Sequence, residues 1–199
     1  ASGAVAAPVA YDDPKGGFSC GGSTGSSVNS IEKTKFLTET SAIISTTLSF
    51  SATWVGALPN SGTAGYVKSG SNMDKMPYAT ETNSSTNNAQ TASNYLAGAG
   101  NVGVAGYWYG GNYSGDNAEI QKTVFSTDTS TTISATLSSS RRGTSALTND
   151  GTAGYTAGGV GSSTTIDKLT YSNDSRSTLS ATLDEGGNDH SGVSNKGSA

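Results

Sequence analysis

Apolar residues in this chain recur in short segments that alternate with small or polar residues, and the same segments return four times. The first segment places an aromatic residue after a glycine, and it occupies residues 16–22, 64–70, 105–111 and 153–159. Its aromatic residues are Phe18, Tyr66, Tyr107 and Tyr155. Brief alternating segments rich in β-branched and aromatic residues, bounded by Gly, Asn and Asp, predict β-strands. No stretch of the chain shows the 3.6-residue apolar period of a helix.

A second segment follows each aromatic segment and carries a lysine, then an aromatic residue, then an acid three positions later. The lysines are Lys33, Lys75, Lys122 and Lys168, and the acids are Glu39, Glu81, Asp128 and Asp174. The separation between each lysine and its acid is the same in all four copies. We therefore expect the two side chains to meet across one hairpin, where an exposed ion pair stabilises by about 0–1 kcal/mol. The alternative is a ring of charges that binds a ligand.

A leucine-containing third segment and a weaker fourth segment complete each unit. Four short strands per unit, repeated with a period in the forties, predict the blades of a β-propeller or another stacked array. We expect an all-β domain of four units, at about residues 16–63, 64–104, 105–152 and 153–199. These units either close into a small propeller or form part of a larger propeller-like assembly. Residues 1–15 precede them as an arm that we expect to reach a neighbouring subunit.

The composition limits the function classes. Of the 199 residues 33% are apolar and 13% are charged, and the net charge of −4 argues against a nucleic-acid partner, which needs a basic face. No apolar run reaches the roughly 18 residues of a membrane span. A single histidine and a single cysteine leave almost no material for a zinc site or a catalytic triad. We expect no enzyme, no metal and no cofactor, and a buried apolar role for Cys20.

The richest aromatic cluster lies in the third unit and offers one candidate binding site. It contains Trp108, Tyr109 and Tyr113, with Asp116 in the following loop. Packing in the core is one interpretation. The other is a platform for a sugar ring, because an aromatic face beside polar side chains suits carbohydrate.

The order of segments resembles kelch-type propeller repeats. In the third unit, residues 107–111, Phe125, Leu137, residues 141–142 and residues 145–147 follow the kelch order. The fourth unit departs from it, with glycines at 186–187 where the arginines stood, and no unit has the usual kelch tryptophan. More narrowly, the chain is similar to degenerate kelch-like repeats in structural proteins of tailed, notably marine, phages.

That resemblance implies a location in a virion or outside the cell. Together with the absence of a catalytic set, it predicts a non-enzymatic structural component that contacts other subunits, its own copies or virion proteins. The alternative is a glycan- or receptor-binding module on a viral fibre or cell surface.

Overall fold

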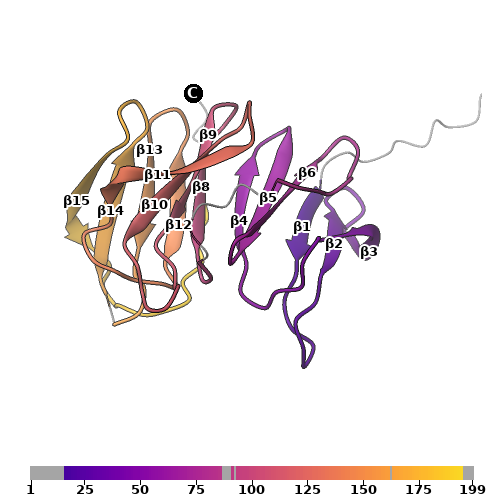
Figure 1. Cartoon of the computed structure of the whole chain (residues 1–199), viewed down its shortest axis with the longest axis horizontal. Coiled ribbons are helices and arrows are strands. Elements are labelled where there is room, and N and C mark those ends of the chain that lie inside the picture. Colours follow the sequence, from indigo (N-terminus) through magenta and orange to yellow (C-terminus); the bar gives the residue numbers. More distant parts are fainter. Residues whose placement is uncertain (1–15, 87–90, 92, 162, 195–199) are drawn as a thin grey trace, which may run out of the picture.

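All regular structure in the described part of the chain is β-strand. The computed structural model describes residues 16–86, 91, 93–161 and 163–194, and these form four antiparallel sheets (Figure 1). The prediction of an all-β chain is confirmed. The predicted arm at 1–15 lies outside the described residues.

Each sheet is a meander in which consecutive strands pair. Sheet 1 contains β1 (Gly16–Cys20), β2 (Ser30–Lys35) and β3 (Thr40–Thr47). Sheet 2 contains β4 (Gly56–Asn60), β5 (Ala64–Ser69), β6 (Asn72–Pro77) and β7 (Ser84–Ser85). Sheet 3 contains β8 (Ala97–Asn101), β9 (Ala105–Tyr109), β10 (Glu119–Val124) and β11 (Thr129–Thr136). Sheet 4 contains β12 (Ser145–Asn149), β13 (Ala153–Ala157), β14 (Thr165–Thr170) and β15 (Ser175–Thr182).

The sheets are offset by one strand from the sequence units. The weak fourth segment of one unit is the first strand of the next sheet, where it pairs with the glycine–aromatic strand: Leu58 lies opposite Tyr66, and Leu147 opposite Tyr155. The four glycine–aromatic segments therefore form the equivalent strands β1, β5, β9 and β13. Strand β1 has no such partner among the described residues, so sheet 1 has three described strands.

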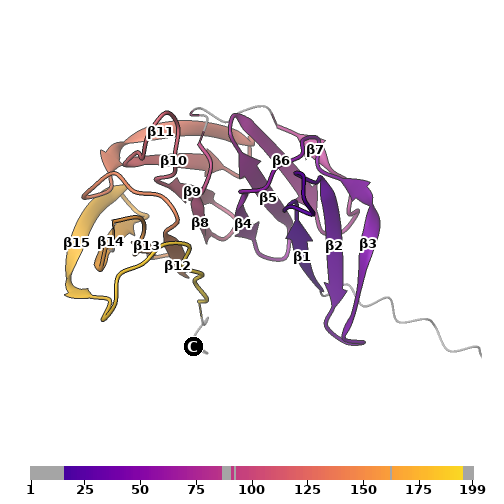
Figure 2. The same ribbon diagram turned by 90° about the horizontal axis from the view of Figure 1, so that it is seen from below.

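The four sheets follow one another along an arc in chain order. Both views place sheet 1 and sheet 4 at opposite ends of this arc (Figures 1 and 2). Strands β4, β8 and β12 lie toward its inner side, and β3, β11 and β15 lie toward its outer side (Figure 2). No described sheet is closed on itself. Each interior sheet therefore has a neighbour on both faces, whereas sheets 1 and 4 each have one.

The core consists of three apolar layers, each between two consecutive sheets. Sheets 1 and 2 enclose Ile31, Leu48, Val67 and Met76. Sheets 2 and 3 enclose Leu58, Tyr66, Met73, Trp108 and Phe125. Sheets 3 and 4 enclose Ala99, Tyr107, Ile120, Leu169 and Tyr171. Contact between neighbouring sheets is thus the main source of buried apolar area and of the stability that follows from it.

Gly106 of sheet 3 lies directly against the Leu58 side chain of sheet 2. A Cβ at this position would lie 1.9 Å from Leu58 Cδ2 of the preceding sheet. Because a packed core absorbs such overlap only by straining its neighbours, Gly106→Ala is expected to lower the free energy of unfolding by about 1–3 kcal/mol in urea denaturation. Gly17→Ala is the matched control, since its Cβ would meet only the Phe36 ring at 3.4 Å. Equal losses for the two variants would contradict this account.

Candidate interaction faces at the two ends of the array

Every sheet carries an acid at a strained position in the turn after its lysine-bearing strand. The φ angles are 52° at Glu39, 51° at Glu81, 54° at Asp128 and 52° at Asp174. A left-handed conformation costs a residue with a side chain about 1–2 kcal/mol. In each turn the side chains flanking the acid hydrogen bond to each other, at 2.7–2.8 Å: Thr38 with Thr40, Thr80 with Thr82, Thr127 with Thr129, and Asn173 with Ser175. All four sheets thus share one turn geometry, which orients the acid in the same way relative to its own sheet.

Each of these acids, except the first, pairs with a lysine of the preceding sheet. Lys75 Nζ lies 2.8 Å from Asp128 Oδ2, and Lys122 Nζ lies 2.7 Å from Asp174 Oδ2. Lys33 pairs in the same way with Glu81. The predicted pairing within one hairpin is therefore wrong. The lysine side chain points toward the following sheet, whereas the turn acid points back toward the preceding one, so the two leave opposite faces of their own sheet.

An aromatic pair accompanies each ion pair. The ring centroids are 5.7 Å apart for Phe18 and Tyr78, 5.2 Å for Tyr66 and Phe125, and 5.0 Å for Tyr107 and Tyr171. Each lysine also lies over the first ring of its pair, with Nζ 5.5–5.8 Å from the centroid. We call these four groups the inter-sheet contact set: a ring and a lysine from one sheet, a ring and a turn acid from the next.

Two of the first rings also donate to the turn acid. The Tyr66 hydroxyl donates to Asp128 Oδ1 at 2.6 Å, and the Tyr107 hydroxyl donates to Asp174 Oδ1 at 2.7 Å. Burial, followed by this hydrogen bond to a carboxylate, raises the pKa of both phenols above the usual tyrosine value. Both phenols therefore stay protonated in the folded chain and hold the acid in place.

The two ends of the array each carry half of a contact set. Sheet 1 presents its second ring and turn acid outward: Phe36 is 62% exposed and Glu39 is exposed. Sheet 4 presents its first ring and lysine, Tyr155 and Lys168, which are half-buried. Within the described part of the chain neither Glu39 nor Lys168 forms an ion pair. We call these surfaces the sheet 1 end face and the sheet 4 end face.

This arrangement explains the burial of three of the four repeated rings. Tyr66 and Tyr107 are each 1% exposed because a following sheet covers them. Tyr155 is half-buried because no described sheet follows it. Phe18 is half-buried although Tyr78 of the following sheet stacks on it. The prediction that all four rings are largely buried holds for the two interior sheets only.

Residues 191–194 occupy the position of an inner strand beside sheet 4. A Cβ on Gly192 would lie 2.4 Å from the Ala146 carbonyl oxygen, and a Cβ on Gly98 of β8 would lie 2.4 Å from the Ala57 carbonyl oxygen of β4. The Thr148 amide donates to Ser194 Oγ at 2.7 Å. This segment thus packs on β12, the inner strand of sheet 4, in the way that β8, the inner strand of sheet 3, packs on β4 of sheet 2. Its central residue, Val193, is 95% exposed.

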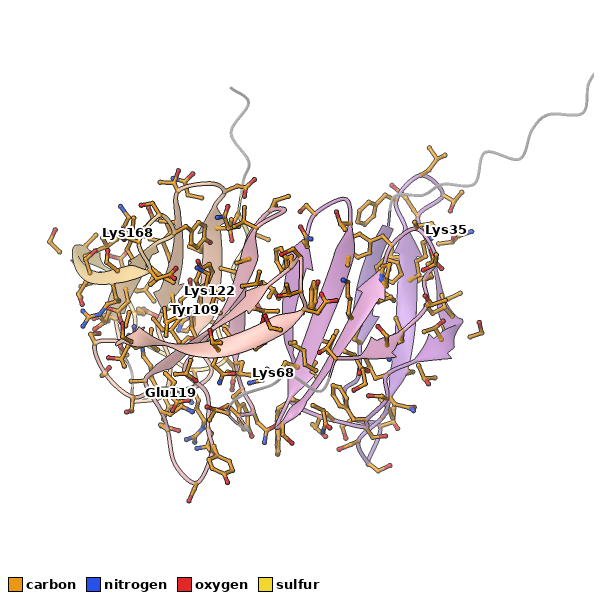
Figure 3. All side chains as sticks on the ribbon, turned by 45° about the horizontal axis from the view of Figure 1, so that its top comes forward. Lys35, Lys68, Tyr109, Glu119, Lys122 and Lys168 are labelled. Atoms are coloured by element: carbon orange, nitrogen blue, oxygen red, sulfur yellow. The ribbon has the colours of Figure 1, made fainter. Side chains whose placement is uncertain are left out.

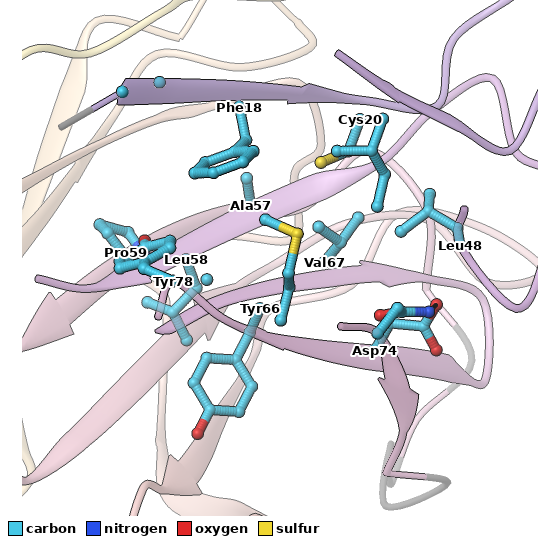
Figure 4. Close-up of a pocket in the computed structure, with 16 residues that line it drawn as sticks. Phe18, Cys20, Leu48, Ala57, Leu58, Pro59, Tyr66, Val67, Asp74 and Tyr78 are labelled. Atoms are coloured by element: carbon cyan, nitrogen blue, oxygen red, sulfur yellow. Dashed lines mark hydrogen bonds between the residues drawn. The ribbon is translucent and has the colours of Figure 1, made fainter. Parts of the chain in front are cut away.

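A cavity of about 180 Å³ lies between sheets 1 and 2, beside the first strand (Figure 4). Its apolar lining includes Phe18 and Cys20 of β1 and Leu58, Tyr66 and Val67 of sheet 2. Burial, and then the nearby Asp74 charge, raises the pKa of Cys20 to about 11. The thiol is therefore protonated at neutral pH and serves as a small, half-buried apolar group.

The structure separates the residues of the predicted sugar platform. Trp108 and Tyr109 are buried in the core, and Trp108 Nε1 donates to Thr123 Oγ1 at 2.9 Å. They cannot present a ring face to a ligand, because neighbouring sheets cover both sides of sheet 3. Tyr113 is exposed on the following loop, and Asp116 there forms an ion pair with Arg142. For Trp108 and Tyr109 the core-packing interpretation is therefore correct, and the alternative of a sugar platform that includes them is wrong.

A different aromatic pair lies on the surface, and sequence analysis missed it. Trp54 stacks on Tyr95 with ring centroids 4.6 Å apart, and the Arg142 guanidinium lies 5.8 Å from the Tyr95 centroid. Trp54 is 52% exposed, and Tyr95 has a φ of 56°. Both aromatics lie outside the repeated segments, which is the one sequence feature that separates them from core rings.

One buried lysine also departs from the repeat. Lys68 is 1% exposed, and its Nζ donates to the Thr91 carbonyl at 2.8 Å and to Gln121 Oε1 at 2.9 Å (Figure 3). Both partners are neutral. Burial lowers the pKa of Lys68 to about 8, against a smaller opposing effect of Glu119.

This buried lysine predicts an unusual dependence of stability on pH. Below pH 8 the lysine is charged in both the folded and the unfolded chain, so its full desolvation cost is present. Between pH 8 and 10.5 the unfolded chain binds more protons, so the contribution of Lys68 to stability rises with pH. The expected gain is on the order of 2 kcal/mol between pH 8 and 10.

Comparison with Lys68→Met isolates this effect, because the raised pKa values of Cys20 and the buried tyrosines oppose it equally in both proteins. Urea denaturation at several pH values should show the wild type gaining stability relative to the variant as the pH rises from 8 to 10. A constant difference would contradict the lowered pKa.

Neither a protein-family model nor a curated protein sequence matches this chain. In the described ranges no helix long and apolar enough to cross a membrane is found. The same residues contain no cluster of three or more His, Cys, Asp or Glu side chains placed to hold a metal ion.

Proposed function

We propose that this chain is a non-enzymatic structural component that works through contacts with other protein subunits in a virion or extracellular assembly. The observation that carries the proposal is the pair of end faces. Three complete contact sets join consecutive sheets. Half of a further set, a ring and an acid, lies at Phe36 and Glu39, and the other half, a ring and a lysine, lies at Tyr155 and Lys168. Exposed apolar surface with a defined charge pattern is typical of a protein contact.

The four sheets are, in this proposal, kelch-like blades of a propeller-like assembly. Their antiparallel meanders of three or four described strands, short inner strands and layered apolar contacts are features of propeller blades. The arc leaves two sheet faces that other subunits would cover, and a stable contact of this kind buries on the order of 1,000 Å² or more in total.

Sedimentation of the native source material tests the proposal. We expect the chain to sediment with particles or filaments, well ahead of a free 19.9 kDa protein. Recovery of the chain solely as a free monomer would contradict a structural role in an assembly. A wash at high salt that leaves the particles intact is the control for adsorption through charge.

The exposed tryptophan supports a second candidate function, a glycan- or receptor-binding module. Trp54, stacked on Tyr95 beside Arg142, offers a ring face with polar groups nearby. A glycan array tests this function, with Trp54→Ala as the variant expected to lose binding and Trp108→Tyr as a core control that keeps Trp54. Absence of binding by the wild-type chain would exclude glycans of the array as ligands.

A further inference from the structure

We infer that the partner at the end faces is a second copy of this chain, docked head to tail, so that the sheet 4 end face of one copy covers the sheet 1 end face of the other. This inference rests on the proposed function and names its partner. The two faces differ in chemistry, so the contact joins unlike surfaces. Such contacts build a closed ring when the rotation closes, and a filament when it does not.

The charges and rings of the two faces complete one contact set. Lys168 stands where Lys33, Lys75 and Lys122 stand, and each of those pairs with the turn acid of the next sheet. The acid that lacks such a lysine is Glu39. Docking brings Lys168 of one copy to Glu39 of the other, and Tyr155 onto Phe36. It would cover Phe36, which is the only second ring of a contact set that no described sheet covers.

The backbone of the two ends is complementary as well. Strand β1 lacks a pairing strand on its inner edge among the described residues. Residues 191–194 lie where the innermost strand of a next sheet would lie, and in the described part no strand pairs with them. In the docked pair this segment adds to β1 as β8 adds to β9, a form of strand addition.

Strand addition would also bury the exposed side chain of Val193. By the equivalence of Gly192 and Gly98, Val193 corresponds to Ala99, which is buried between sheets 3 and 4, and to Leu58, buried between sheets 2 and 3. The corresponding space in sheet 1 is the apolar cavity beside Phe18 and Cys20 (Figure 4). Docking therefore moves an exposed valine of one copy into the cavity of the other.

One position weakens the contact and offers a gain-of-function test. The residue after the third-segment leucine is Ser49 or Ser138 at internal contacts, where its amide and hydroxyl donate to Asp74 or Asp167. In the fourth unit this residue is Asp184, which would face Glu32 of the other copy. Because like charges repel there, Asp184→Ser is expected to tighten self-association several-fold in sedimentation velocity.

Charge reversal is the main test. Lys168→Glu and Glu39→Lys are each expected to weaken self-association of the full chain by about tenfold or more, since each puts like charges together. An equimolar mixture of the two variants restores opposite charges at one junction and keeps the native pair at the other, so it should associate again. Lys35→Glu is the matched control, because Lys35 shares the face of Lys33 and so points away from the sheet 1 end face. It should associate like wild type.

Zero-length cross-linking locates the contact on the unmodified chain. A carbodiimide joins a lysine to a carboxylate only when the two touch, and the internal pair Lys75–Asp128 supplies a positive control within each copy. In a mixture of isotopically light and heavy chains, we expect a Lys168–Glu39 link that joins light to heavy. Formation of the internal links without a Lys168–Glu39 link would overturn the inference, as would a link found only within single copies.

The competing occupant of the β1 edge is residues 1–15 of the same chain. A chain lacking these residues should associate at least as well as the full chain if the second copy supplies the strand. Loss of association on truncation, or failure of the charge-reversal mixture, overturns docking by sheet 4. Co-sedimentation with native particles would then still support the proposed function with a different subunit as partner, so the two ideas fail separately.

Discussion

Replacing Asp167 with alanine is expected to lower the free energy of unfolding by about 3–5 kcal/mol, because it leaves a buried guanidinium without its counter-charge. Arg141 Nη2 lies 2.6 Å from Asp167 Oδ2, and both side chains are 1% exposed. The carboxylate also accepts hydrogen bonds from the Ser138 amide and hydroxyl, both at 2.9 Å, and from the Thr178 hydroxyl at 2.7 Å. This carboxylate therefore joins the end of sheet 3 to sheet 4.

Asp74→Ala is the matched control, measured in the same urea denaturation. Asp74 holds the equivalent place in sheet 2 and accepts hydrogen bonds from Ser49 and Asn83, with no arginine beside it. Its loss should be smaller. The double variant Asp167→Ala with Arg141→Met should recover part of the loss, since it removes both charges. A double variant less stable than Asp167→Ala would contradict the buried-charge explanation.

Trp108→Ala is expected to lower the free energy of unfolding by a similar amount, about 3–5 kcal/mol, because it leaves a large cavity in the apolar layer between sheets 2 and 3. Trp108 is buried there among Leu58, Met73 and Phe125. The indole nitrogen donates to Thr123 Oγ1, and truncation leaves that hydroxyl without this partner. Chemical denaturation followed by circular dichroism measures the loss.

The chain's second tryptophan supplies the control for this prediction. Trp54 is half-exposed and stacks on a surface tyrosine, so Trp54→Ala should change stability by about 0.5 kcal/mol or little more. If Trp108→Ala kept full stability and instead removed a binding activity, its assignment to the core would be wrong.

The sequence pattern predicted the elements far better than their partners. Alternation and the recurring glycine–aromatic phrase located β1, β5, β9 and β13, because side-chain alternation reflects which positions a strand buries. The lysine–acid spacing, however, is equally consistent with a pair inside one hairpin and with a pair between neighbouring sheets. Only the direction in which each side chain leaves its sheet distinguishes the two, and a constant spacing in identical repeats contains no such information.

Residues that differ from their counterparts in the other units also carry structural information, which a comparison of the shared residues alone does not use. Lys68 stands where Cys20, Tyr109 and Ala157 stand, and its partner Gln121 is the only amide at a position that is otherwise acidic, as in Asp74 and Asp167. Paired exceptions in adjacent units indicate contact across a sheet boundary. Read together, they would have predicted that each unit packs against the next through these faces.

The uniform polarity of the inter-sheet contacts has a consequence for how such a chain changes in evolution. Each sheet presents a ring and a lysine to the following sheet and a ring and an acid to the preceding one, and the ion pairs of the described residues that join these groups link consecutive sheets. Loss of residues 97–144 would bring Tyr66 and Lys75 against Tyr171 and Asp174, the same chemistry as before. Unequal recombination between repeats can therefore lengthen or shorten the gene by whole sheets and still leave a ring, a lysine and an acid to meet at each new junction.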